Sequence, residues 1–168
     1  MKMNKKDFVF FFGTNGKKIE KACFSQFFMR RFYVDGHEYC CMEQYMMAQK
    51  ALLFKDMDIL REILNCYEPK EIKALGRKVS NFRTKVWNEH KLDIVYKGNL
   101  AKFSQNEDLK EILLATGDKI IVEASPYDSI WGIGMSASNP NATDPEKWKG
   151  QNLLGKTLEK VRDTIRNS

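Results

Sequence analysis

The sequence predicts an α+β fold, in which a small β-sheet packs against several helices in one compact domain that spans residues 1–168. Two observations favour this class. Strand-like apolar runs are concentrated in the first forty residues, whereas helical periodicity dominates the rest, apart from one apolar run at residues 120–122. In addition, 168 residues of which 43% are hydrophobic are enough for one core, and no repeat or low-complexity linker divides the chain.

Strands are expected in the N-terminal part of the chain. The apolar runs there cover residues 8–12, 23–28 and 31–39. Asp35-Gly36 lies inside the last run and supplies turn chemistry between apolar flanks, which predicts a hairpin.

Helices are expected next. Residues 42–53 have a helix-rich composition, and Pro69 suits the first turn of a later helix. Between them, Asp56 can cap a helix whose apolar residues recur at helical spacing: Ile59, Leu60, Ile63 and Leu64.

The second half of the chain continues this helical pattern. A long helix is expected over residues 84–103, and Ser104-Gln-Asn-Glu107 has the capping-box pattern that opens a helix, which Gly117 would end. After the strand at 120–122 and a loop over residues 135–150, a last helix is expected to bury Leu154, Leu158, Val161 and Ile165.

Composition excludes several classes of protein. The net charge of +6 favours an anionic partner, but the lysines are dispersed and no nucleic-acid-binding motif is visible. No segment has the length of a membrane span, and the run at residues 8–12 is too short for a signal peptide. A cytoplasmic protein without membrane contact is therefore expected.

Metal and cofactor sites are not expected. The four cysteines lack the paired spacing of a zinc site and are interpreted as reduced, mostly buried thiols. His37 and His90 are isolated, which leaves neither a histidine-based triad nor a histidine cluster. Chemistry by carboxylates is favoured instead.

The stretch after the strand at 120–122 is the first candidate site. Glu123, Asp128 and Trp131 follow the strand end, and Gly132 lets a ligand or another backbone segment approach the indole. Two structural alternatives are open. Either carboxylate could bond turn amides, and the indole could belong to the core.

A second candidate site lies on the helix at residues 42–53. Glu43 and Lys50 fall on one face, with Gln44 on an adjacent edge. By spacing alone they could be a solvated surface pair. The apolar bulk of Tyr45 and Met46 instead indicates that Glu43 lies near the core, where a carboxylate needs a partner or a catalytic task.

The C-terminal part adds one weak signal. Gly150-Gln-Asn-Leu-Leu-Gly-Lys156 lacks the P-loop arrangement of glycine and lysine, although it could place helix N-terminal amides near an anion.

Together these motifs resemble the NADAR family, also called the YbiA-like family. The resemblance covers nearly the whole chain in order and rests on Glu43-Gln-Tyr-Met-Met-Ala-Gln-Lys-Ala51, Gly76-Arg77, Lys102-Phe103, Thr116-Gly-Asp118, Glu123-Ala124, Asp128 with Trp131-Gly-Ile-Gly134, and residues 150–156 with Arg162. It implies an α+β fold and hydrolysis of N-glycosidic bonds. Two substrate settings follow from it: phosphorylated ribosylamino intermediates of riboflavin synthesis, and ADP-ribose attached to guanine bases, with nucleic acid as the carrier.

The resemblance also implies roles for individual residues. Glu43, Lys50, Asp128 and Trp131 fall on the active-site motifs. We expect Glu43 to act at the ribose by activating water or stabilising an oxocarbenium-like cation. Asp128 would bind the leaving amine or base, and Trp131 would stack on its ring. Lys50 could pair with a substrate phosphate, or it could form a Schiff base with a ring-opened sugar. The sequence favours a phosphate-binding or structural role, because nothing in it indicates a lowered pKa.

Three further positions are expected to bind substrate. Many relatives have Glu-His where this chain has Glu43-Gln44, and Gln44 is interpreted as an orienting hydrogen-bonder because an amide does not exchange protons near neutral pH. Gly132 and Asn152 lie within the other matching motifs. A non-catalytic module that binds ADP-ribose or a nucleotide is the alternative to an enzyme.

Overall fold

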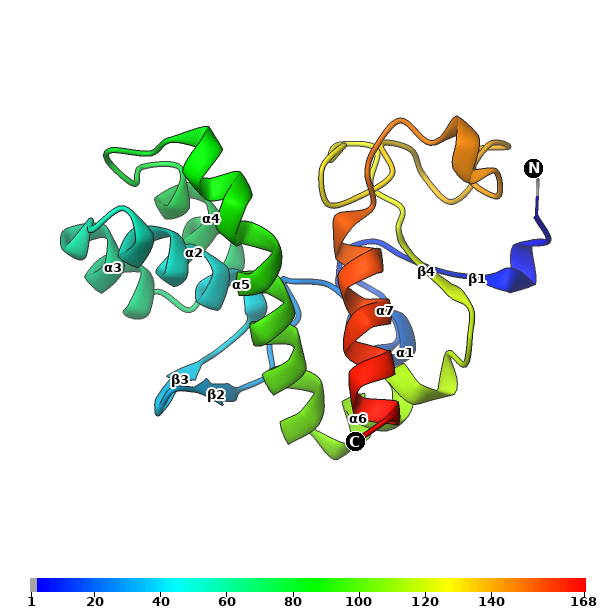
Figure 1. Ribbon diagram of the computed structural model, residues 1–168, viewed down its shortest axis with the longest axis horizontal. Helices are drawn as coiled ribbons and strands as arrows, with labels where there is room; N and C mark the ends of the chain where they lie inside the picture. The colour runs from blue at the N-terminus through cyan, green and yellow to red at the C-terminus, as the bar shows by residue number, and fades with distance from the viewer. Residues whose placement is uncertain (1–2) are drawn as a thin grey trace. The chain divides into compact units, whose positions relative to one another are not determined.

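The computed structural model describes residues 3–168 and confirms the α+β class (Figure 1). In chain order, the described elements are η1 (Lys5–Asp7), β1 (Phe8–Phe11), α1 (Ile19–Ala22), β2 (Phe32–Val34), β3 (His37–Tyr39), α2 (Met42–Leu53), α3 (Met57–Leu64), α4 (Pro69–Gly76), α5 (Thr84–Gln105), α6 (Glu107–Ala115), β4 (Ile120–Glu123), η2 (Pro145–Lys147) and α7 (Leu153–Arg166). Here η marks a short 3₁₀ helix.

The chain divides into two compact units. The first combines the residues up to Ser25 with Glu107–Ser168, and the second is Gln26–Asn106. The second unit is thus an insertion in the sequence between β1 and β4. A single domain over residues 1–168 stays a prediction.

The first unit is built on the pair of β1 and β4. These strands are parallel, and Phe8 pairs with Ile120 and Phe11 with Glu123. The core on this pair contains Phe8, Phe10, Val122, Ala124, Ile133, Met135 and Ala142. Parallel neighbours cannot be joined by a tight hairpin, and here residues 12–119 form the connection.

Helix α7 packs directly against β4. The predicted apolar stripe of this helix is buried, as expected. Gly155 is required at the contact, because a Cβ atom there would clash with the carbonyl oxygen of Ile121. Arg162 is also buried and donates hydrogen bonds to the Thr116 hydroxyl (2.9 Å) and the Lys119 carbonyl (2.8 Å), which ties α7 to the approach to β4.

The second unit is organised around α2. This helix packs against α3, α4 and α5, and eight of its twelve residues are buried. Close approach depends on two glycines, since a side chain at Gly76 would overlap Met47 and one at Gly98 would overlap Met42. The predicted hairpin is also present, with Phe32 paired to Tyr39 and the turn at Asp35-Gly36 in the left-handed region.

Most predicted elements are confirmed, including the cap of α3, where the Asp56 carboxylate accepts the Ile59 amide at 3.1 Å. The strand expected over residues 23–28 is wrong. The amides of Cys23 and Ser25 donate hydrogen bonds back to α1, and Cys23 and Phe24 are buried within a turn. A short apolar run without alternation does not distinguish a strand from other buried segments.

The predicted capping box at Ser104–Glu107 is also wrong. Helix α5 continues through Gln105, so Ser104 is still helical. The Asn106 amide donates to the Lys102 carbonyl (2.9 Å) and the Arg31 carbonyl (3.1 Å) and closes α5 instead. The sequence predicted one small sheet. Within residues 3–168 the structure instead has two separate two-stranded sheets, one formed by β1 and β4 and the other by β2 and β3.

Within residues 3–168, none of the helices combines the length and the apolar character needed to cross a bilayer. The cytoplasmic location stays a prediction.

Candidate active site

The first turn of α2 places two polar side chains inside the second unit. Glu43 is 4% exposed and Gln44 is 2% exposed, so a solvated surface carboxylate is the wrong interpretation of Glu43. The turn is fixed because the Glu43 amide donates to the Gln26 carbonyl (2.9 Å) and the Tyr45 amide donates to the Cys41 carbonyl (3.2 Å). A carboxylate removed from water in this way needs compensating interactions.

Lys50 lies two turns further along α2 and is half-buried. Its amine donates to the Gly76 carbonyl at 2.7 Å and lies 4.6 Å from the centre of the Phe82 ring and 5.9 Å from that of Trp87. Burial lowers the pKa of Lys50, the negative charge of Glu43 opposes that shift, and the positive charge of Arg77 reinforces it. The Glu43 charge thus acts on the Lys50 amine, and burial makes this amine lose its proton more readily than a solvent-exposed lysine would.

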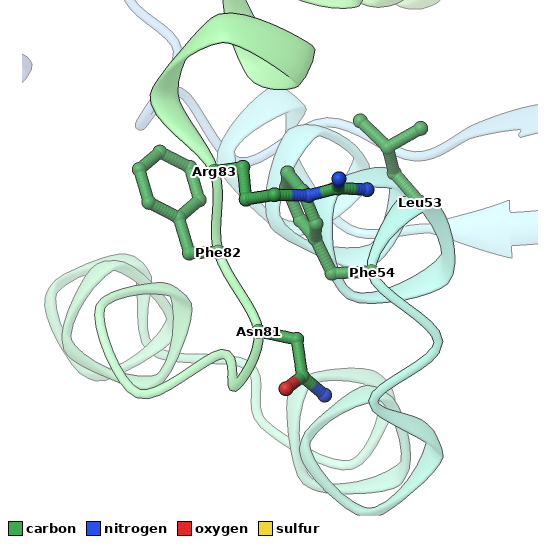
Figure 2. Close-up of a pocket in the computed structure, with 5 residues that line it drawn as sticks. All are labelled: Leu53, Phe54, Asn81, Phe82 and Arg83. Atoms are coloured by element: carbon green, nitrogen blue, oxygen red, sulfur yellow. The ribbon is translucent and has the colours of Figure 1, made fainter.

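The same unit contains a hollow of about 430 Å³, which is lined by Leu53, Phe54, Asn81, Phe82 and Arg83 (Figure 2). Phe82 connects the Lys50 amine to this hollow, because its ring faces the amine and also lines the hollow. Inside the hollow, the Phe82 ring packs against Phe54, with ring centres 5.2 Å apart. The Arg83 side chain extends across the hollow towards Leu53 in Figure 2. Within residues 3–168 the Arg83 guanidinium has no hydrogen-bond or ion-pair partner. The hollow is therefore lined by an exposed cation and by the rings of Phe54 and Phe82.

Gln44 is engaged by the backbone of its own unit. Its Oε1 accepts the Cys40 amide (2.8 Å), and its Nε2 donates to the carbonyls of Ile63 (3.1 Å) and Cys66 (3.0 Å). These bonds tie the start of α2 to the end of α3. Both N–H donors are used, which leaves one lone pair of Oε1 for any other partner. Substrate binding by Gln44 stays a prediction.

In the first unit, Asp128 organises the loop after β4. Its Oδ1 accepts the amides of Ile130 and Trp131, both at 2.8 Å. The sequence analysis allowed either Glu123 or Asp128 to accept hydrogen bonds from turn amides, and this is confirmed for Asp128. The second carboxylate oxygen is not needed for this turn, so the catalytic role of Asp128 stays a prediction. Trp131, held by this bond, is half-buried.

This loop is joined to residues 149–154 by backbone hydrogen bonds. Five amides of the later segment donate to carbonyls of residues 129–133, at 2.9 to 3.2 Å. Two of the donors are Leu153 and Leu154 at the start of α7, which bond the carbonyls of Ile130 and Trp131. The sequence suggested that the first amides of this helix could face an anion. For Leu153 and Leu154 this is wrong, because their amides already donate to loop carbonyls.

Asn152 extends this pairing to the edge of β4. Its backbone is left-handed, with φ of 53°, and its side chain is 1% exposed. Oδ1 accepts the Glu123 amide (3.0 Å) and Nδ2 donates to the Ile121 carbonyl (2.9 Å), so the side chain bonds β4 as a neighbouring strand would. Gly132 has a packing role too, since a Cβ there would lie 2.8 Å from the Glu123 carbonyl oxygen. Substrate binding by Asn152 and Gly132 stays a prediction.

Within the part of the chain that the structure describes, no group of three or more histidine, cysteine, aspartate or glutamate side chains is placed to hold a metal ion. Activity without a metal stays a prediction.

A comparison with protein families gives a decisive match. The NADAR domain model aligns with residues 10–166. The chain belongs to the NADAR domain family. The match runs through both units, and the family recognition made from the sequence is confirmed.

Individual relatives agree with this assignment. The chain is 50% identical over 161 residues to N-glycosidase R617 of Acanthamoeba polyphaga mimivirus, covering 93% of this chain and 95% of that protein. It is 37% identical over 146 residues to N-glycosidase Npun_R5314 of Nostoc punctiforme, covering 87% and 86% respectively. The NMR structure of the Escherichia coli protein YbiA matches with a TM-score of 0.78 at 28% identity, covering 99% of this chain and 89% of that one.

The sequence interpretation of this NADAR chain missed Phe82 and Arg83. The signal available in the sequence was the pair Phe82-Arg83, which follows Asn81 directly and comes just before the long helix. Asn81 has φ of 60°, a conformation that asparagine tolerates better than most residues. Such a turn presents consecutive side chains to the same hollow, but sequence spacing alone did not connect it to Lys50.

Proposed function

We propose that this NADAR chain hydrolyses the N-glycosidic bond between a phosphorylated ribose and an amine, as in the phosphorylated ribosylamino intermediates of riboflavin synthesis. The chain is an N-glycosidase by its kinship with R617 and Npun_R5314, which carry that name at 50% and 37% identity over most of this chain. The observation that carries the mechanism is the half-buried Lys50 amine, whose pKa is lowered by burial and on which the charge of the buried Glu43 acts.

Lys50 is the proposed nucleophile. The sequence favoured a phosphate or structural role because nothing in it indicated a depressed pKa, and the pKa lowered by burial supports the Schiff-base role instead. The ring-opened substrate carries a C1=N bond to the departing amine. The Lys50 nitrogen adds to C1 and passes both of its protons to the departing nitrogen as the bond between C1 and that nitrogen breaks, which frees the amine and leaves an imine at Lys50. Water then adds to this imine and hydrolyses it, which restores the Lys50 amine and releases the sugar aldehyde.

Glu43 is the proposed proton carrier of these steps. Each addition and elimination moves a proton between two nitrogens or between water and nitrogen, and a carboxylate close to the amine can accept and return it. Its negative charge also favours cationic imines and any oxocarbenium-like species at C1. Burial at 4% exposure strengthens both effects because water screens the charge less.

Arg83 is the proposed contact for the substrate phosphate. Its guanidinium is uncompensated within residues 3–168, and it lines the hollow that Phe82 connects to the Lys50 amine. Arginine binds phosphate oxygens in a bidentate manner. Lys50 therefore does not have to serve both as phosphate partner and as nucleophile.

Asp128 and Trp131 remain candidates for the leaving group. Asp128→Asn separates charge from structure, because an amide oxygen can still accept the amides of Ile130 and Trp131. If the carboxylate binds the leaving amine, Asp128→Asn lowers turnover while thermal stability stays close to that of the wild type. Unchanged turnover would leave Asp128 as a turn residue only.

Removal of ADP-ribose from guanine bases is the second candidate function. The net charge of +6 favours a nucleic-acid carrier, and a hollow lined by Arg83 and two aromatic rings suits a diphosphate joined to a base. A non-catalytic ADP-ribose-binding module would not need Glu43 or a depressed Lys50 pKa.

The test is a side-by-side assay of the purified protein with ribosylaminopyrimidine phosphates and with ADP-ribosylated guanine DNA. We expect turnover of the first, and Arg83→Gln should raise KM for the phosphorylated substrate with a smaller change in kcat. Turnover of the DNA alone would favour the second function. Binding without any turnover would contradict both hydrolase proposals.

A further inference from the structure

Gly76 contacts the Lys50 amine from helix α4. It is the last residue of α4, and its carbonyl accepts a hydrogen bond from the amine at 2.7 Å. The last carbonyls of a helix have no partner within the helix, which leaves this oxygen available to a side chain. Both residues belong to the second unit. The position of the amine is therefore set by α4 as well as by α2, which carries Lys50.

Two aromatic rings border the same amine. The centre of the Phe82 ring lies 4.6 Å from Lys50 Nζ, and that of the Trp87 ring lies 5.9 Å away. A neutral amine has two N–H groups and one lone pair, and the Gly76 carbonyl takes one N–H. The carbonyl thus orients the amine and leaves the lone pair to add to C1 of the substrate.

The packing of α2 on α4 excludes a side chain at Gly76. A Cβ there would overlap Sδ of Met47 and lie 2.8 Å from its Cγ. Met47 is buried, so its side chain has little free volume to move into. The backbone of Gly76 is helical, and alanine is the better helix former. Space rather than backbone conformation therefore explains the glycine.

The missing side chain and the carbonyl of Gly76 meet the same face of α2. Met47 and Lys50 are three residues apart on this helix, so they are neighbours on its surface. Met47 fills the space that a Cβ of Gly76 would take, and Lys50 bonds the carbonyl. A wider spacing between α2 and α4 would therefore lengthen the bond to the amine.

We propose that Gly76 is the positioning residue of Lys50. Its missing side chain lets α2 approach α4, and its carbonyl then holds the amine in the half-buried place from which it attacks C1. The positioning role rests on the proposed function, in which Lys50 is the nucleophile. A substitution at Gly76 should therefore act through Lys50 and not through substrate binding.

Gly98 provides a matched control. It is also a buried, helical glycine packed on α2, where a Cβ would lie 2.6 Å from Met42 Sδ and from Tyr45 Cδ2. Gly98→Ala should thus disturb the packing of α2 as Gly76→Ala does. The Lys50 amine, however, donates to the carbonyl of Gly76 and not to that of Gly98. The two variants therefore differ in whether the disturbed contact also holds the amine.

The charges around the amine are the same in all of these variants. Within residues 3–168, the charges that act on it are those of Glu43 on α2 and Arg77 at the end of α4. Gly76→Ala keeps both charges, and it also keeps the carbonyl, which belongs to the backbone. Burial is the largest cause of the lowered pKa of Lys50, so an amine released into water should titrate like an exposed lysine.

The position of the amine is measured without hydrolase activity. The full-length protein is labelled with trace acetic anhydride at several pH values, and mass spectrometry compares Lys50 with the exposed Lys55. In the wild type, Lys50 should titrate at lower pH than Lys55. In Gly76→Ala, it should titrate close to Lys55. Adding Met47→Ala should restore the wild-type titration, because the new Cβ would lie 3.5 Å from that of residue 47, an ordinary contact.

Three outcomes of the labelling would overturn the proposal. One is an unchanged Lys50 titration in Gly76→Ala, and another is an equal shift in Gly98→Ala. The third is equal titration of Lys50 and Lys55 in the wild type, which decides the matter even if a variant does not fold. Circular dichroism confirms that each labelled variant is folded.

Turnover connects the position of the amine to the reaction. Gly76→Ala should lower kcat about tenfold to hundredfold with little change in KM, because a misplaced nucleophile binds no less substrate. The double variant with Met47→Ala should recover most of this loss relative to Met47→Ala alone. A shifted Lys50 titration with unchanged kcat would overturn the positioning role. A shifted titration in a protein without hydrolase activity would confirm the hold on the amine and contradict the proposed function alone.

Discussion

Helix α2 and the loop that follows β4 both carry polar side chains, but these side chains have different surroundings in the two regions. In α2, Lys50 keeps a pKa lowered by burial beside the buried Glu43. In the loop, Asp128 and Asn152 direct oxygens and amide groups to backbone partners. A shifted titratable group is a stronger indication of chemistry than a polar group that completes the backbone. The comparison assigns reactivity to α2 and rigidity to the loop.

The largest effect is expected at Lys50. Lys50→Arg keeps a cation for phosphate or for the Gly76 carbonyl but removes the nucleophile, so turnover should fall about 10⁴-fold or more. Lys55→Arg, on an exposed lysine beyond the end of α2, is the control and should change nothing. Steady-state kinetics measures both, and substantial turnover by Lys50→Arg would return this residue to a phosphate or structural role.

Glu43→Gln should have the next largest effect. It preserves side-chain shape and removes the charge, so we expect turnover to fall about 10² to 10⁴-fold. Binding of ribose phosphates, followed by thermal shift, should change little. A near-normal kcat would remove Glu43 from the mechanism and weaken the contrast between α2 and the loop.

Asn152→Ala tests the loop side of the comparison. It leaves the Glu123 amide and the Ile121 carbonyl without their partner, and each buried polar group without a partner costs about 1 to 3 kcal/mol. Urea unfolding should therefore show a loss of about 2 to 6 kcal/mol for the two groups, and the remaining folded protein should turn over normally. A stable variant with impaired substrate binding would instead support Asn152 as a ligand.

Trp131 separates binding from packing with a smaller effect. If the half-buried indole stacks on the leaving base, Trp131→Ala should weaken binding by about 1 to 3 kcal/mol, and Trp131→Phe should retain most of it. Titration with substrate measures this, and urea unfolding is run alongside. A variant with several kcal/mol less folding stability but normal binding would show that the indole is a core residue.

The smallest expected effect is on the pH dependence of stability. Because burial lowers the pKa of Lys50, the unfolded chain binds more protons than the folded chain between the folded pKa and the ordinary lysine value. Stability should therefore rise with pH across that window, and Lys50→Met should flatten the rise. A steeper rise in Lys50→Met, measured by urea unfolding at several pH values, would contradict the direction of the shift.

Regular elements and their burial were largely predictable. Alternation, helical spacing and the Asp56 cap fixed α2, α3, α7 and the hairpin, because local chemistry determines them. The turn at Cys23–Ser25 was not predictable, since its apolar side chains are buried by contacts distant in sequence. Glu43 and Lys50 were found from one helix face. Arg83 and Phe82 come from a separate turn, and only the folded second unit brings the Phe82 ring to the Lys50 amine.

The most direct test of the account is to trap the proposed imine. The protein turns over a ribosylamine phosphate in the presence of sodium borohydride, which reduces a lysine imine to a stable amine, and the adduct is located by mass spectrometry. We expect a pentose phosphate attached to Lys50, with parallel loss of activity, and no adduct in Lys50→Arg. Continued turnover without any adduct, or an adduct at another lysine, would contradict it.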